Sequence, residues 1–122
     1  FSVRYSWHYP FRLDCASMNG AIGAIVGTHD FSSFKKKNEL YRSCEREVLR
    51  ARVVRRRPFV HIVIEATGFL RYMVRNIVGT LVLVGAGKMT PEEFRSVIDA
   101  RDRDLAGPTA PPQGLFLRRV TY

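Results

Sequence analysis

The stretch FLRYMVRNIVG, residues 69–79, places two arginines inside a run that is otherwise almost wholly apolar. Apolar side chains in and just after it recur at the i, i+3, i+4, i+7 spacing of one helical face, which predicts a buried helix. The residues on that face are Leu70, Met73, Val74, Ile77, Val78 and Leu81. Gly79 inside the helix indicates that a neighbouring backbone approaches closely at this point.

Arg75 lies on the flank of this apolar face, so we expect it at the rim of the core. At a rim, a guanidinium can pair bidentately with a carboxylate or a phosphate. A salt bridge within the chain, for example to Glu65, or a side chain that simply extends into solvent, explains the same position. The spacing alone therefore leaves a functional and a structural role open.

The sequence before this helix predicts an extended lead-in, a helix and a hairpin. Residues 1–13 are expected to be extended, and Asp14 can cap a helix that ends at Gly27. The apolar residues of that helix are Met18, Ala21, Ile22, Ile25 and Val26. A polar loop is expected over 27–43. Residues 48–56 and 59–66 alternate as strands do, with the RRRP segment as their turn and Val60, Ile62 and Ile64 on one face.

The sequence after residue 79 predicts another helix, a long loop and a last strand. Thr90, Pro91 and Glu93 form a capping-box pattern for a helix that ends near Arg101. Its buried residues are expected to be Phe94, Val97 and Ile98. The segment DRDLAGPTAPPQG, residues 102–114, is too rich in proline and glycine for regular structure, and residues 115–122 predict a strand.

The resulting order is helix, hairpin, helix, helix, strand, which favours an α+β fold in a single domain of 122 residues. We expect an antiparallel or mixed sheet with helices packed on one of its faces. The other face of such a sheet is then free to bind a partner.

Charge narrows the choice of partner. The chain has 20 Lys and Arg against 11 Asp and Glu, a net charge of +9, which favours a polyanion such as nucleic acid or an anionic membrane surface. The basic residues cluster at 35–37, at 50–57, and at Arg71 with Arg75. Aromatic residues close to the first cluster suit a nucleic-acid groove, although a run of lysines is more often a solvated loop.

Other sequence features concern the compartment and the ends of the chain. The two cysteines, Cys15 and Cys44, have no metal-ligand spacing, and a reduced, cytosolic setting is the default expectation. The longest apolar run, residues 77–86, is too short to span a bilayer, and the N-terminus does not resemble a signal peptide. Because the chain begins with Phe, we expect an excised domain or a processed product.

Two kinds of chemistry find little support in the sequence. The Ser, His and Asp of THDFSS, residues 28–33, invite a hydrolase interpretation, but no strand-turn-helix nucleophile motif surrounds them. The alternative is a loop in which Asp30 and the serines bond local backbone groups. His8, His29 and His61 have no partner at metal-ligand spacing, and no glycine-rich phosphate loop occurs.

Four separated motifs, in collinear order, resemble those of the TruA-type tRNA pseudouridine synthases. They are RYSWHYP (4–10), GTHDFSSF (27–34), FLRYMVRNIVG (69–79) and GPTAPPQGLFLRRVTY (107–122). The resemblance implies an enzyme that isomerises uridine to pseudouridine in tRNA, with an Asp as nucleophile, a Tyr packed on the target base and no metal or organic cofactor. It also implies that the enzyme is a cytoplasmic homodimer. The best-known members of the family act on the anticodon arm of tRNA.

The same resemblance implies roles for particular residues. Arg75 matches the arginine that pairs with the catalytic Asp, while Phe69, Leu70, Met73 and Leu115 would line the pocket for the base. Lys35, Lys36, Lys37 and Arg71 would contact the RNA. The G-R-T-D motif that carries the Asp, and the motif that carries the Tyr, are absent from the 122 residues. The resemblance thus implies the C-terminal half of the enzyme, inactive alone, with the anion for Arg75 supplied from outside this chain.

Two other functions remain open at this point. The chain can be a stand-alone RNA-binding module that keeps the fold without the chemistry. It can also be a scaffold or dimerisation domain whose basic surface is incidental.

Overall fold

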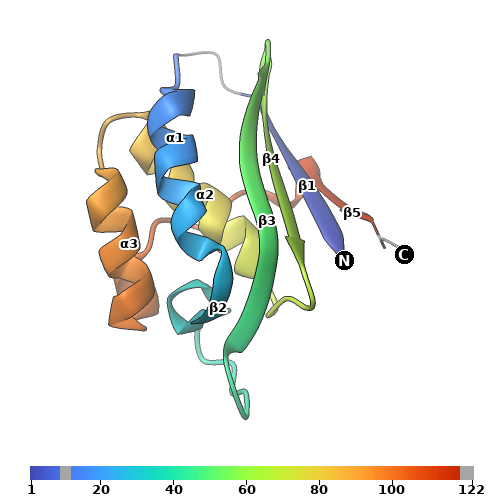
Figure 1. The fold of residues 1–122 in the computed structure, drawn as a ribbon, viewed down its shortest axis with the longest axis vertical. Helices are drawn as coiled ribbons and strands as arrows, with labels where there is room; N and C mark the ends of the chain where they lie inside the picture. The colour runs from blue at the N-terminus through green and yellow to red at the C-terminus, as the bar shows by residue number, and fades with distance from the viewer. Residues whose placement is uncertain (9–11, 119–122) are drawn as a thin grey trace.

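The computed structural model describes residues 1–8 and 12–118, which form one sheet layer and one helix layer (Figure 1). The strands are β1 (Ser2–His8), β2 (Gly27–Asp30), β3 (Glu45–Arg56), β4 (Phe59–Ala66) and β5 (Leu115–Arg118). The helices are α1 (Cys15–Ile22), α2 (Met73–Gly85) and α3 (Pro91–Ala100). All three helices lie on the same face of the sheet, so the expected α+β architecture is confirmed.

The sheet has the order β2-β3-β4-β1-β5, and every neighbouring pair is antiparallel. Alternation along β4 buries Val60, Ile62 and Ile64 against the helices, as the sequence predicts. The hairpin is also confirmed, although β3 begins at Glu45, three residues before the predicted start. β5 begins at Leu115 as predicted, and residues 119–122 of the predicted strand lie outside the described residues.

Two strands were missing from the predicted order of elements. β1 is paired on both sides, with β4 and β5, and buries Val3 and Tyr5. The polar residues Ser2, Arg4, Ser6 and His8 alternate with Val3, Tyr5 and Trp7, so the sequence carried a strand signal in a segment predicted only as extended. β2 is four residues long and polar, and it pairs at the sheet edge with β3 inside the segment predicted as loop. Short polar edge strands carry little sequence signal.

The first helix is capped as predicted but ends early. Asp14 Oδ1 accepts from the Ser17 amide at 3.0 Å, and Met18, Ala21 and Ile22 are buried. A 3₁₀ turn at Gly23–Ile25 follows, and Val26 has extended backbone with 42% of its surface exposed. The prediction that Val26 lies on the buried helical face is therefore wrong, because regular helix stops before it.

The central helix α2 begins at Met73, not near Leu70 as the periodicity predicts. Tyr72 precedes it with a left-handed backbone, φ 65°, which a helix cannot contain. Leu70 lies in the turn before the helix. Its side chain is buried, and its carbonyl accepts from the Met73 amide at 3.0 Å. Past its first turn α2 is buried on most sides, as expected for an apolar helix between layers.

The third helix matches its prediction closely. The Glu93 amide donates to Thr90 Oγ1 and the Thr90 amide donates to Glu93 Oε1, both at 3.1 Å, which is the predicted capping box. Phe94, Val97 and Ile98 are buried. The helix ends at Ala100, and Arg101 caps it with φ 53°.

Candidate functional site

Arg75 projects from the first turn of α2 and is held at two points. Its Nε donates to the Ala110 carbonyl at 2.8 Å, and the centre of its guanidinium lies 4.6 Å from the centroid of the Tyr72 ring. Within the described residues, its two terminal nitrogens have no hydrogen-bond partner. An arginine held at Nε and on its face, with both Nη atoms available, is oriented for a bidentate anion.

Within residues 1–8 and 12–118, no carboxylate forms an ion pair with Arg75. The two ion pairs that the structure describes are Lys37–Asp104 and Arg101–Asp30. Glu65 follows Ile64, whose side chain points into the core, so Glu65 lies on the sheet face opposite the helices. The half-buried position of Arg75 agrees with the predicted rim of the core.

The loop that positions Arg75 passes directly over Gly79. We call residues 106–114 the proline loop. A Cβ at Gly79 would overlap the Pro108 carbonyl and lie 3.3 Å from the Ala110 amide nitrogen. The Ala110 amide donates in turn to the Arg75 carbonyl at 2.9 Å, and the Tyr5 hydroxyl donates to the Pro111 carbonyl. The predicted close backbone approach at Gly79 is thus confirmed, and its effect is to bring the proline loop against Arg75.

Tyr5 links this loop to the closing strand. Leu115 is the cross-strand partner of Tyr5 between β1 and β5. Burial raises the pKa of Tyr5, and the positive charge of Arg75 partly opposes that rise. Arg75, Tyr5 and Leu115 therefore lie in one region, although they come from three distant parts of the sequence.

The residues predicted to line a base pocket divide by exposure. Leu115 is 37% exposed and Phe69 is partly buried against the core. Leu70 and Met73 are almost completely buried. Leu115 is thus accessible in this region and Phe69 is partly exposed, whereas Leu70 and Met73 are core residues of the described chain.

Asn76, one residue after Arg75, joins two loops to α2. Its amide nitrogen donates to the carbonyls of Phe34 and Lys35, at 2.8 and 3.1 Å. Its amide oxygen accepts from Arg103 Nη2 at 3.0 Å and from Thr109 Oγ1 at 2.6 Å. The side chain is buried and fully hydrogen-bonded, so it fixes the loops on both sides of the helix.

The three consecutive lysines have three different environments. Lys35 Nζ donates to the Glu39 carbonyl at 3.0 Å, Lys36 Nζ lies 5.5 Å from the Tyr72 ring centroid, and Lys37 pairs with Asp104 at 3.0 Å. Arg71 lies 5.6 Å from the same ring centroid. The predicted RNA-binding residues Lys36 and Arg71 are thus brought together with Arg75 around Tyr72, and Lys35 is directed back into its own loop.

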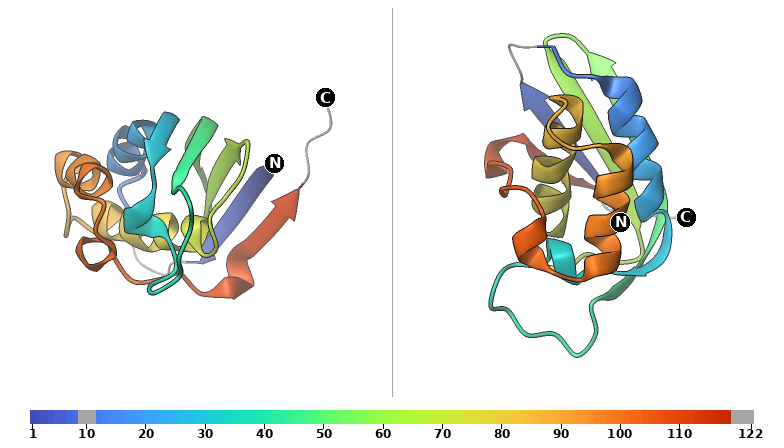
Figure 2. Two further views of the ribbon diagram at one scale, coloured as in Figure 1. Left: turned by 90° about the horizontal axis from the view of Figure 1, so that it is seen from below. Right: turned by 90° about the vertical axis from the view of Figure 1, so that its left-hand side faces the viewer.

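The loop that carries these lysines, residues 35–44, is called the lysine loop. It projects from the body of the molecule (Figure 2). At its start the Lys36 amide donates to the Arg71 carbonyl, and the Arg71 amide donates to the Tyr41 hydroxyl at 2.9 Å. The turn before α2 and the lysine loop are therefore one connected surface.

A second basic surface lies on the sheet face that the helices leave open. Register pairs Arg4 with Val63 and Val63 with Arg52, so both arginines lie on that face, where both are exposed. Arg50 and Arg56 share this face by alternation along β3. Arg55 points the other way and donates to the Leu13 carbonyl at 3.1 Å. The basic cluster at 50–57 is thus divided between two faces by the strand that carries it.

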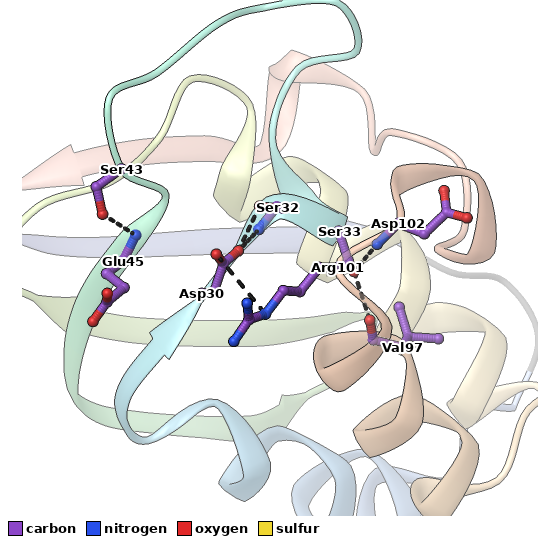
Figure 3. Close-up of polar contacts among 8 residues, drawn as sticks. All are labelled: Asp30, Ser32, Ser33, Ser43, Glu45, Val97, Arg101 and Asp102. Atoms are coloured by element: carbon purple, nitrogen blue, oxygen red, sulfur yellow. Dashed lines mark hydrogen bonds and ion pairs between the residues drawn. The ribbon is translucent and has the colours of Figure 1, made fainter.

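The THDFSS segment is structural (Figure 3). Asp30 accepts from the Ser32 amide at 2.9 Å, and Ser33 Oγ donates to the Val97 carbonyl while accepting from the Asp102 amide. His29 Nε2 lies 2.8 Å from the Val26 carbonyl, away from the serines. The predicted local bonding is confirmed for Asp30 and Ser32, whereas Ser33 bonds distant backbone groups and residues 28–30 belong to β2. The segment has no arrangement of nucleophile and base.

The described residues contain neither a metal-binding cluster nor a membrane-spanning helix. Residues 1–8 and 12–118 include no group of three or more His, Cys, Asp or Glu side chains placed to hold a metal ion. Over the same ranges, no helix combines the length and the apolar character that crossing a membrane requires.

Sequence reasoning missed Tyr72, Asn76 and Arg103. Asn76 had a usable signal, since a single amide inside an apolar helix must find partners if it is buried. The left-handed backbone of Tyr72 has no such signal, because neither Gly nor Asn stands at that position. Arg103 looked like one charge among several in an exposed loop.

Known protein sequences are similar to this chain over most of its length. The profile of a family described as tRNA pseudouridine synthase matches residues 21–122. The tRNA pseudouridine synthase A of Thermosipho melanesiensis is 44% identical over the whole chain, and that of Moorella thermoacetica is also 44% identical over the whole chain. The Chloroflexus aurantiacus enzyme of the same name is 45% identical over 94% of the chain. The chain spans about half the length of these curated relatives, at 50%, 50% and 43%. On the family match and this identity, the chain belongs to the tRNA pseudouridine synthase family.

Proposed function

We propose that residues 1–122 are the C-terminal domain of a tRNA pseudouridine synthase and form one wall of its active site. The observation that carries the proposal is Arg75, fixed by Ala110 and Tyr72 with both terminal nitrogens unbonded within the described residues. An arginine prepared in this way fits a carboxylate from the other half of the protein. The relatives support that division, since the chain covers only half of their length.

In the proposed reaction, the carboxylate from the other half is the nucleophile on a flipped uridine. Arg75 keeps that carboxylate ionised and oriented, because a nearby positive charge favours the charged form. The N-glycosidic bond breaks, the uracil rotates, and a carbon–carbon glycosidic bond forms. The product is an isomer of the substrate, so the reaction consumes no oxidant, reductant or other co-substrate.

The remaining site residues have supporting roles in this proposal. Phe69 and Leu115 would contact the flipped base, and Leu70 and Met73 would fix the wall behind them, since an extruded base needs apolar surroundings. Lys35, Lys36, Lys37 and Arg71 would follow the RNA backbone without specifying sequence. The complete enzyme would act on the anticodon arm of tRNA as a cytoplasmic homodimer.

The first arm of the test compares residues 1–122 alone with a longer protein that also includes the residues encoded upstream of Phe1. We call the longer one the joined protein. Pseudouridine formation is measured in an unmodified tRNA transcript. We expect activity only in the joined protein, because the chain holds Arg75 but no matching Asp motif. Activity of the chain alone would mean that an acid of this chain is the nucleophile, and Asp30 would be examined first.

The second arm changes Arg75 in the joined protein. Arg75→Ala should lower turnover by about a thousandfold or more with little loss of tRNA affinity. Arg75→Lys keeps the charge but loses the planar fork, so its turnover should also fall steeply. The comparison variant is Arg71→Ala, which removes a positive charge from the same Tyr72 ring. As a proposed RNA contact, Arg71 should affect tRNA affinity and leave turnover largely unchanged, the opposite of Arg75→Ala. Turnover of Arg75→Ala within about twofold of the unchanged protein would contradict the proposal.

The open basic face of the sheet supports one alternative, an RNA-binding module without chemistry. Arg4, Arg50, Arg52 and Arg56 would then contact the RNA. If the joined protein binds tRNA with a steep salt dependence but forms no pseudouridine, this alternative replaces the proposal.

A further inference from the structure

A cavity of about 480 Å³ lies beside the start of α2, between the lysine loop and the proline loop. We call it the basic cavity. The residues that the argument uses are Lys36, Lys37, Tyr72, Asn76, Arg103 and Asp104, all of which line it. Tyr72, Asn76 and Arg103 come from outside the set that the sequence predicted to bind RNA. The cavity shares its Tyr72 wall with Arg75, so it adjoins the candidate active site.

The cavity contains more positive charge than its own acid can neutralise. Lys36, Lys37 and Arg103 line it, against the single carboxylate of Asp104. The hydrogen bonds described for Arg103 all go to neutral oxygens, those of Gly107, Asn76 and Thr109, at 2.9 to 3.2 Å. These bonds fix the guanidinium, while burial lowers the pKa of Arg103 and the charge of Asp104 partly opposes that shift. An anion that entered the cavity would add to the partial compensation that Asp104 supplies.

The one acid in the cavity is held by a weak contact. Lys37 Nζ and Asp104 Oδ1 are 3.0 Å apart, and both side chains are about two-thirds exposed, at 66% and 69%. Ion pairs of this kind contribute at most about 1 kcal/mol. A phosphate can therefore take the place of the Asp104 carboxylate at Lys37 with little loss.

We propose that the basic cavity holds a phosphodiester of the bound RNA, and that Asp104 occupies Lys37 until the phosphate displaces it. This inference rests on the proposed function for the identity of the RNA. Continuity of the surface supports it, because Lys36 and Arg75 contact the same Tyr72 ring, at 5.5 and 4.6 Å. A nucleotide beside Arg75 would place the neighbouring backbone within reach of Lys36, which lies against the same ring.

Removing the acid and removing a base from the basic cavity should have opposite effects on the affinity for tRNA. With the chain joined to its upstream sequence, affinity for an unmodified tRNA transcript is measured by fluorescence anisotropy over a range of salt concentrations. Asp104→Asn should tighten binding about threefold, because Lys37 no longer has to leave a partner. Lys37→Ala should weaken binding and reduce the salt slope by about one.

Matched controls separate the cavity from the general effect of net charge. Glu92→Gln makes the same charge change as Asp104→Asn on the exposed first turn of α3, and Lys88→Ala matches Lys37→Ala at another exposed site. Neither control should change the affinity. In the Lys37→Ala background, Asp104→Asn should lose most of its effect, since the carboxylate acts through Lys37.

Two results would overturn the inference. One is an equal gain in affinity for Asp104→Asn and Glu92→Gln, and the other is an unchanged salt slope for Lys37→Ala. Pseudouridine formation by the unchanged protein, measured on the same preparation, keeps the two proposals apart. If the unchanged protein is active but the variants do not show the predicted pattern of affinities, only the phosphate site is rejected. If the pattern is present without activity, the phosphate site stands and the proposed enzyme does not.

Discussion

The lysine loop and the proline loop lie on either side of Arg75, and both lack regular strands and α-helices, yet they are held very differently. The proline loop bonds three separate parts of the molecule: Arg75 and Thr80 of α2, Tyr5 of β1, and Arg103. The lysine loop bonds the rest of the molecule through the Lys36 amide, the exposed Lys37–Asp104 pair and the Tyr41 hydroxyl, and Leu40 between these points is 91% exposed. Composition rich in proline and glycine predicts the absence of helix and strand, but it does not predict how firmly a loop is fixed.

The largest expected effect comes from forcing the proline loop away from α2. In Gly79→Ala the new methyl group overlaps the Pro108 carbonyl, which is backbone and cannot rotate aside. We expect a loss of about 3 kcal/mol in the free energy of unfolding, measured by urea denaturation. Gly20→Ala in α1 is the matched control, because a Cβ there meets no atom within 4 Å. That change should stabilise the chain by about 0.5 kcal/mol, and equal unfolding midpoints for the two variants would contradict the comparison.

The next largest effect is expected from substitutions that remove hydrogen bonds to both loops or to the proline loop alone. Asn76→Ala leaves the carbonyls of Phe34 and Lys35 without their donor and should cost about 2 kcal/mol. Amide hydrogen exchange should then accelerate at Lys36 and at Ala110 together. Thr80→Val removes the hydroxyl that accepts from the Gly107 amide and donates to the Asn76 carbonyl, but leaves the Asn76 side chain bonded to the lysine loop, so exchange should accelerate in the proline loop alone. Acceleration of Lys36 in Thr80→Val would show that the loops are not held independently.

The smallest effect is expected at the exposed part of the lysine loop. Leu40→Ser changes an exposed side chain at the tip of the lysine loop and should alter the free energy of unfolding by less than about 0.5 kcal/mol. Ala110→Ser in the proline loop instead places a hydroxyl at a buried position and should cost about 1 kcal/mol. Thermal unfolding of the two variants measures the difference. A larger loss for Leu40→Ser would mean that the lysine loop is held by contacts that exposure does not reveal.

The parts of the fold that the sequence predicted correctly are those where one local signal dominates. The capping box at Thr90 and Glu93, the alternation on β4 and the close approach at Gly79 each depend on a few neighbouring residues. The central position of β1 depends on pairing with β4 and β5, about 60 and 110 residues away, which no local pattern contains. The start of α2 depends on the backbone of Tyr72, for which the sequence offers no marker.

The candidate site divides in the same way. Arg75 was identifiable because a charge on the flank of an apolar helix requires a partner. The carbonyl that fixes Arg75 comes from Ala110, a residue whose side chain has no chemistry, and only the path of the proline loop brings it there. Arg103 was not identifiable for a related reason, since its role depends on Asn76, Gly107 and Thr109 meeting around it. Sequence indicates which groups need partners, and the fold determines which partners they meet.

The fixed orientation of Arg75 also has an entropic meaning. A free arginine side chain has about 2 kcal/mol of rotamer entropy to lose when it is immobilised. Here the bond from Nε to Ala110 and the stacking on Tyr72 already restrict it within the chain. If a carboxylate docks at Arg75 as proposed, it does not have to order the arginine, and more of the electrostatic attraction contributes to binding.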